Sequence, residues 1–79
     1  MCPYPDFTVM HPKTDQILYW EHFGLMDDLS YRKSAAHKVQ RYMEHGIFPS
    51  DKLITTYESG DTPFTPQITE KTIAHFFQT

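Results

Sequence analysis

Asp6 and Glu21 are the two residues whose types and spacing suggest chemistry. Each lies in a segment with strand character, and the two segments are close enough in the sequence to pair as a hairpin. Two carboxylates on neighbouring strands repel each other, so one takes up a proton unless a cation satisfies both. A hard divalent ion, Mg²⁺ or Mn²⁺, prefers oxygen ligands and leaves open positions for water and a phosphate oxygen. The pair therefore predicts a divalent-metal site.

The length of the connecting loop decides whether the two carboxylates meet. A four-residue loop, 12–15, pairs His11 with Gln16 and puts Asp6 directly opposite Glu21, with Cβ atoms about 5 Å apart. A two-residue loop makes the carboxylates diagonal neighbours on the same face of the sheet. A three-residue loop puts them on opposite faces, where they cannot share an ion.

Lys38 is the cation that could complete such a site. Over 28–45, the helical period places four residues within one sector of about 60°: Tyr31, Ala35, Lys38 and Tyr42. Lys38 thus lies at the border of the apolar stripe, where its stem can follow apolar surface while its ammonium reaches the carboxylates. There the ammonium could polarise a scissile phosphate or orient an attacking water that a bound metal activates.

A β-hairpin is expected to carry the two carboxylates. Residues 6–11 and 16–23 are rich in β-branched and aromatic side chains, which favour strands, and Gly24 ends the second segment. The segment that joins them contains Pro12, which cannot donate a hydrogen bond to a strand ladder and is typical of a turn.

Two helices and a third strand should follow the hairpin. The pattern predicts a helix over 28–45, a strand over 52–58, and a last helix with proline at its first position. Residue types that usually begin or end helices stand at these boundaries: Asp28 or Ser30, Gly46 and Thr65. The element order is therefore β-β-α-β-α.

This order predicts an α+β fold of one small domain spanning residues 1–79. The strand–helix–strand stretch is long enough for a crossover, so the third strand should run parallel to a hairpin strand. A small mixed three-stranded sheet with two packed helices follows. Because a chain of 79 residues has a marginal core and such a sheet has unpaired edges, we expect a homo-oligomer formed through a sheet edge or an aromatic face.

The composition excludes several classes of protein. The net charge of −3 counts against a freestanding electrostatic DNA-binding module. Cys2 is the single cysteine, which excludes an internal disulfide framework and a cysteine-rich zinc site. No apolar run approaches the roughly 20 residues that span a bilayer. The first residues lack the features of a secretory signal, so a cytoplasmic protein without membrane contact is expected.

The two acidic residues also carry a resemblance. Pro5-Asp6, followed after a β-turn by Glu21, resembles the PD-(D/E)XK nuclease superfamily, which has the restriction-endonuclease-like fold. Over roughly residues 4–58 the chain resembles bacterial proteins that share a longer pattern: Pro5-Asp6-Phe7-Thr8, Tyr19-Trp20-Glu21-His22-Phe23-Gly24, Tyr31, Lys38, Tyr42, Gly46 and Leu53-Ile54-Thr55. The superfamily core begins with a helix and a strand before the Pro-Asp segment, so the chain looks like the C-terminal half of such a domain.

The resemblance implies a role for each candidate residue. Asp6, Glu21 and the backbone carbonyl of His22 would hold Mg²⁺ or Mn²⁺. With Lys38, the two carboxylates would catalyse the hydrolysis of DNA phosphodiesters. The lysine that the superfamily places two residues after its second acidic residue would fall at Phe23. Lys38 is therefore the candidate for that cation.

Purely structural roles are the alternative for the same residues. Asp6 could be a turn residue at the start of a strand, and Glu21 could pair with a lysine or arginine at the end of a hairpin. Lys38 could simply extend from a helix border into solvent. The corresponding function is a non-catalytic interaction domain that dimerises through its sheet and its exposed aromatic residues. His22, beside Glu21, is a further candidate for a zinc ligand.

Overall fold

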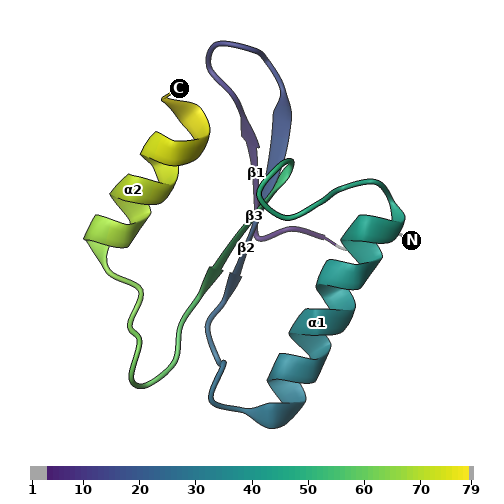
Figure 1. Ribbon diagram of the computed structural model, residues 1–79, viewed down its shortest axis with the longest axis vertical. Helices are drawn as coiled ribbons and strands as arrows, with labels where there is room; N and C mark the ends of the chain where they lie inside the picture. The colour runs from purple at the N-terminus through teal and green to yellow at the C-terminus, as the bar shows by residue number, and fades with distance from the viewer. Residues whose placement is uncertain (1–3, 79) are drawn as a thin grey trace.

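The computed structural model describes residues 4–78 and has five elements in the expected order (Figure 1). They are β1 (Phe7–Met10), β2 (Ile17–Phe23), α1 (Leu29–Glu44), β3 (Leu53–Tyr57) and α2 (Pro66–Phe77). The strands form one mixed sheet in the order β1-β2-β3, in which β1 is antiparallel and β3 parallel to β2. The predicted α+β fold is thereby confirmed. Cys2 lies outside the described residues.

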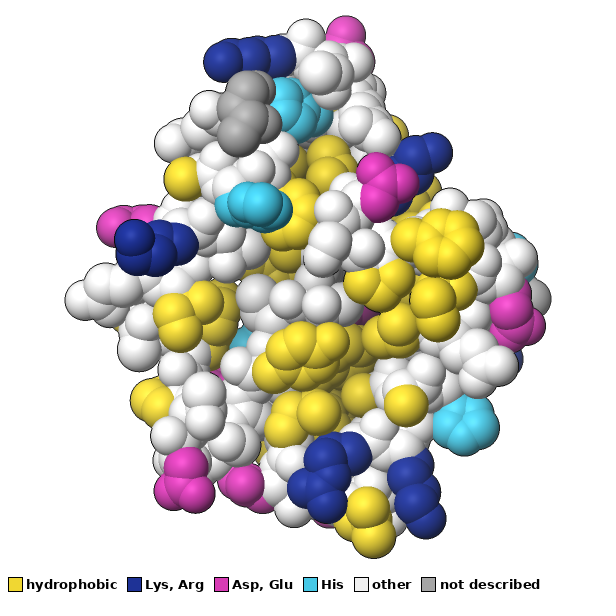
Figure 2. Space-filling view, viewed as in Figure 1, with side chains coloured by type: hydrophobic (Ala, Val, Ile, Leu, Met, Phe, Trp, Pro, Cys, Tyr) yellow, Lys and Arg dark blue, Asp and Glu magenta, His cyan; other side chains and the backbone are white. Residues whose placement is uncertain are grey.

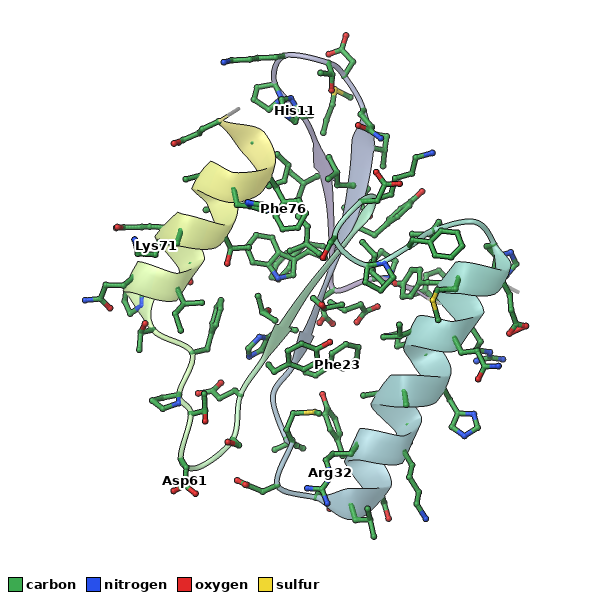
Figure 3. The ribbon with its side chains drawn as sticks, in the orientation of Figure 1. His11, Phe23, Arg32, Asp61, Lys71 and Phe76 are labelled. Carbon is green, nitrogen blue, oxygen red and sulfur yellow. The ribbon has the colours of Figure 1, made fainter. Side chains whose placement is uncertain are left out.

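The sheet is the middle of three layers, with α1 beside one face and α2 beside the other (Figure 1). Successive side chains of a strand point to opposite faces. Accordingly, Leu18 of β2 forms a core cluster with Ile54 and with Phe77 of α2, whereas Tyr19 meets Tyr42 of α1 at a ring-centroid distance of 6.4 Å. Figure 3 shows Phe76 of α2 pointing toward the strands. The two faces of β2 thus serve two different helices.

Both helices begin at residues that favour helix caps, and α1 ends just before a glycine. The Oδ1 atom of Asp28 accepts the Tyr31 N–H at 3.0 Å, so Asp28 caps α1. After α1 the chain turns at Gly46, whose φ of 78° lies in the left-handed region that favours glycine. The Oγ1 atom of Thr65 accepts the Ile68 N–H at 3.3 Å and caps α2. The predicted helix boundaries are therefore close to the observed ones.

The hairpin loop has the four-residue form. The His11 N–H donates to the Gln16 carbonyl at 2.8 Å, and the Asp15 N–H donates to the His11 carbonyl at 3.0 Å. Asp15 takes a φ of 61°, which aspartate tolerates better than most residues. In the resulting register, the position opposite Asp6 on β2 is Glu21. The two carboxylates therefore start from the same face of the sheet.

The free edge of β3 is partly covered by the chain itself. In the parallel ladder, the backbone groups of Leu53, Thr55 and Tyr57 point away from β2. The Leu53 N–H donates to the Phe48 carbonyl at 3.1 Å, and the Leu53 carbonyl accepts the Ser50 N–H at 2.9 Å. Thr55 and Tyr57 remain as the open part of this edge. β1, the other edge strand, has only four residues.

No helix in the described part of the chain has both the length and the apolar character needed to cross a membrane.

Candidate functional site

Glu21 is a buried carboxylate held by two donors from α1. Glu21 is 1% exposed, although the sheet that carries it has only three strands. Its Oε2 atom accepts a hydrogen bond from the Tyr42 hydroxyl, with an O···O distance of 2.5 Å. The Lys38 Nζ atom lies 3.0 Å from Oε1 and 2.9 Å from Oε2. A carboxylate removed from water requires such partners, because an unpaired buried charge is strongly destabilising.

Lys38 connects this buried carboxylate to solvent. Its side chain is 33% exposed, whereas that of Glu21 is 2% exposed. The stem therefore follows the helix–sheet boundary while the ammonium spans the two oxygens of Glu21 and remains reachable from outside. Lys38 lies four residues before Tyr42, so both donors come from one face of α1.

Asp6 lies opposite Glu21 at the end of the β1–β2 pairing. The ladder between the two strands ends at Phe7, and beyond it the Asp6 Oδ2 atom accepts the backbone N–H of His22 at 2.8 Å. Within residues 4–78, the other carboxylate oxygen of Asp6 accepts no hydrogen bond. Asp6 is exposed, so this oxygen is accessible to a ligand from solvent.

Asp6, Glu21 and Lys38 line one open pocket of about 150 Å³. Its remaining wall is formed by His22, Phe23, Tyr31, Ser34 and Ala35. Figure 3 shows Phe23 on the side of the strands that faces α1. The fold thus brings together the three residues that sequence analysis proposed, one from just before β1, one from β2 and one from α1. Their metal-binding and catalytic roles stay predictions.

The His22 ring lies on the opposite face of the sheet from this pocket. Its Nδ1 atom is 2.9 Å from the Thr56 Oγ1 atom, and its Nε2 atom is 3.3 Å from the Glu58 Oε1 atom. The ring also lies against Phe64, with a centroid distance of 4.6 Å. The ring therefore cannot join Asp6 and Glu21 around one ion. Only the backbone of His22 faces the two carboxylates.

Two tyrosines of α1 belong to the site, and sequence reasoning assigned a chemical role to neither. Tyr42 holds Glu21, and the Tyr31 Oη atom accepts the Gly24 N–H at 3.1 Å at the edge of the pocket. Both lie in the same helical stripe as Lys38, and this spacing was the sequence signal that connected them to the site. Aromatic residues in such a stripe usually pack in a core, so the spacing alone could not identify them as polar contacts.

Comparisons with protein-family models, curated proteins and solved structures find no match. Membership of the PD-(D/E)XK superfamily therefore stays a prediction that rests on the motif residues.

The donor set of the pocket suits a hard divalent cation. Among residues 4–78, no three His, Cys, Asp or Glu side chains lie close enough to hold a metal by themselves. An ion would instead use the two carboxylates, a backbone carbonyl and water, which are all oxygen ligands. The charges of Glu21 and Lys38 cancel, and Asp6 leaves the pocket with a net negative charge that attracts a cation. Oxygen donors of this kind are those that Mg²⁺ and Mn²⁺ prefer, and the binding of either ion stays a prediction.

Proposed function

We propose that the chain is a metal-dependent phosphodiester hydrolase domain, or the remnant of one, that acts on DNA. In this proposal Asp6, Glu21 and the backbone carbonyl of His22 hold Mg²⁺ or Mn²⁺. The convergence of Asp6, Glu21 and Lys38 on one open pocket supports it most directly. A bound divalent ion would lower the pKa of a coordinated water and stabilise charge that develops on the phosphate.

The residues of the chain would contribute orientation and charge. The His22 N–H holds one oxygen of Asp6 and directs the other outward. The Tyr42 hydroxyl fixes the Glu21 carboxylate from the buried side. The Lys38 ammonium donates to Glu21, and its remaining N–H groups can donate a hydrogen bond to a phosphate oxygen in the pocket.

A Mn²⁺ titration followed by thermal melting tests the metal site. A ligand present at 100 times its Kd stabilises the folded state by about 2.7 kcal/mol, which raises the Tm of a chain of this size by roughly 10–20 °C. Asp6→Asn should lose most of this rise, because an amide is a poor ligand for Mn²⁺. The amide oxygen can still accept the His22 N–H, so the fold should be retained.

Asp27→Asn is a matched control for this substitution. Asp27 is also exposed, and its Oδ2 atom accepts the Gly60 N–H at 2.6 Å. It does not line the pocket of Asp6, so Asp27→Asn should respond to Mn²⁺ like the original chain. Equal responses in all three proteins would contradict the metal site.

Hydrolysis is measured on a fluorescently labelled DNA duplex and on its separated strands, in Mg²⁺ and in Mn²⁺. Cleavage should disappear in Asp6→Asn and in Lys38→Met, and should persist in Asp27→Asn. A chain that responds to Mn²⁺ but cleaves neither substrate would contradict the hydrolase function and leave a metal-binding domain.

A second candidate function is a non-catalytic domain that pairs with a second copy of the chain. Figure 2 shows hydrophobic side chains gathered over the middle of one face of the molecule. Three large side chains on or beside β3 are at least 43% exposed: Tyr57 of the strand itself, Phe48, whose carbonyl accepts the Leu53 N–H, and Ile68, which lines a pocket with Thr55. An antiparallel contact between two β3 edges would cover them and satisfy the outward backbone groups of Thr55 and Tyr57.

Light scattering tests this pairing at micromolar concentration. The chain should be a dimer, and Thr55→Pro should make it monomeric, because proline removes an N–H that points away from β2. Thr8→Pro is the matched control, since the Thr8 N–H also points outward but from the β1 edge. A monomer at this concentration would exclude the second candidate.

A further inference from the structure

Tyr31 presents a hydroxyl proton in the pocket of Asp6 and Lys38. Its Oη atom accepts the Gly24 N–H at 3.1 Å, which fixes the phenol ring and occupies one side of the oxygen. Within residues 4–78, the proton of this hydroxyl has no acceptor. Tyr42, three stripe positions further along α1, instead donates a hydrogen bond to Glu21. The two tyrosines thus differ in what their hydroxyls can still bind.

Ser34 adds a second hydroxyl to the same wall. It is exposed, lines the same pocket, and lies three residues after Tyr31 and four before Lys38. These spacings place the three side chains on one face of α1. No hydrogen bond from the Ser34 hydroxyl occurs in the described part of the chain. The wall of the pocket formed by α1 therefore carries three hydrogen-bond donors beside the apolar Ala35, and Asp6 lies on the side of the sheet.

Hydrogen-bond donors on one wall and a carboxylate on the other suit a phosphate group that binds together with a cation. Phosphate oxygens accept hydrogen bonds from hydroxyls and ammonium groups. Asp6 repels a phosphate, because the charge of Lys38 is already balanced by Glu21. A divalent ion on Asp6 would remove this repulsion. The pocket should therefore bind a phosphate group only when the cation is present.

We propose that Tyr31 and Ser34 are positioning residues that donate hydrogen bonds to a phosphate oxygen of the substrate. The inference rests on the proposed metal site and extends it to the group that the metal and Lys38 would act on. The phenol of Tyr31 is rigidly placed by the Gly24 N–H, so it can orient a phosphate with little loss of side-chain freedom.

Thermal melting with thymidine 5′-monophosphate as the probe tests the inference without requiring catalysis. In the original chain, Mn²⁺ should raise the Tm, and the nucleotide should raise it further only when Mn²⁺ is present. Thymidine, which lacks the phosphate, should add nothing. Tyr31→Phe should keep the response to Mn²⁺, while its apparent Kd for the nucleotide rises about ten- to hundredfold, as expected for a lost hydrogen bond to a charged group.

Ser34→Ala provides a variant that leaves the fold intact, because an exposed helical serine without a hydrogen bond is readily replaced. It should weaken nucleotide binding several-fold. Tyr57→Phe is the matched control for Tyr31→Phe, since Tyr57 is half exposed on β3 and does not line the pocket. Its nucleotide affinity should equal that of the original chain.

The outcomes separate the two proposals. A normal Mn²⁺ response with unchanged nucleotide affinity in both Tyr31→Phe and Ser34→Ala overturns this inference and leaves the metal site standing. A nucleotide effect of equal size with and without Mn²⁺ also overturns it. The absence of any Mn²⁺ response in the original chain overturns the metal site and this inference together.

Discussion

Glu21 has two hydrogen-bond donors that differ sharply in burial, and this difference predicts unequal costs when each donor is removed. Tyr42 is 0% exposed, whereas the Lys38 side chain is 33% exposed. Tyr42→Phe removes only the hydroxyl that donates to Glu21. Lys38→Met removes only the ammonium and keeps an apolar stem of similar length. Each substitution therefore tests one donor with little change in packing.

The magnitudes follow from what can replace each donor. No water can reach Glu21 from the side of Tyr42, so Tyr42→Phe removes the buried donor of the Glu21 Oε2 atom and leaves that oxygen with only Lys38 among its partners described above. Hydrogen bonds to charged groups contribute about 1.5–3 kcal/mol, and we expect a loss of about 2 kcal/mol. Water can approach from the side of Lys38, so Lys38→Met should cost only about 1 kcal/mol. At about 4–8 °C per kcal/mol, the corresponding Tm decreases are roughly 8–16 °C and 4–8 °C.

Urea unfolding in the absence of divalent ions measures these costs, with the fluorescence of Trp20, the single tryptophan, as the probe. Trp20 lies on the opposite face of the sheet, where its Nε1–H donates to the Thr56 Oγ1 atom at 3.0 Å, so neither substitution touches the probe. Tyr57→Phe, at a half-exposed position, should change the free energy of unfolding by less than about 0.5 kcal/mol. Equal costs for Tyr42→Phe and Lys38→Met, or a larger cost for the lysine, would refute the argument from burial.

Three further substitutions test the elements that position the site. Gly46→Ala should lower stability by about 1 kcal/mol, because Gly46 has a φ of 78° while an added Cβ would meet open space; a gain in Tm would contradict this. Asp28→Ala should cost about 1 kcal/mol and reduce α1 helicity in circular dichroism, because Asp28 caps the Tyr31 N–H. Phe77→Ala should cost about 3–5 kcal/mol by opening a cavity beside Leu18 and Ile54, measured by urea unfolding; an unchanged midpoint would show that α2 contributes little to the core.

The sequence predicts most of the fold because local signals and the global arrangement agree here. Thr65 and Pro66 mark the start of α2 as clearly as any residues of the chain, and both take the expected positions. Asp28 and Gly46 bracket α1 in the same way. The parallel pairing of β3 with β2 follows from the length of the connection, because a crossover of this length can return the chain to the same end of the sheet.

The site was harder to predict because its geometry depends on one loop. Asp6 and Glu21 meet only if the hairpin loop has an even number of residues, and composition does not distinguish the three loop lengths. The deciding contacts are made by the backbone groups of His11, Asp15 and Gln16. Asp15 must adopt a positive φ to make them, and that is a property of the folded turn rather than of the residue type.

The edge of β3 shows a second limit of sequence patterns. An unpaired edge was expected, yet the chain folds back on itself so that Phe48 and Ser50 bond to Leu53. Ser50 takes a φ of 66° to do so, which few residues other than glycine, asparagine or aspartate adopt. A serine there gives no signal of such a turn. The edge available to a second chain is consequently shorter than the strand itself.

The burial of Glu21 links the structural and the catalytic hypotheses. A carboxylate that served only as an ion-pair partner at the end of a hairpin would be expected near solvent, where pairing with lysine contributes little. Here the Glu21 carboxylate is buried beneath α1, and the Tyr42 hydroxyl and the Lys38 ammonium compensate for its desolvation. Asp6, opposite it, keeps one oxygen accessible. In the proposed metal site an ion held by Asp6 would share Glu21 with Lys38, so metal binding and the stability of the α1–sheet contact should be coupled through one side chain.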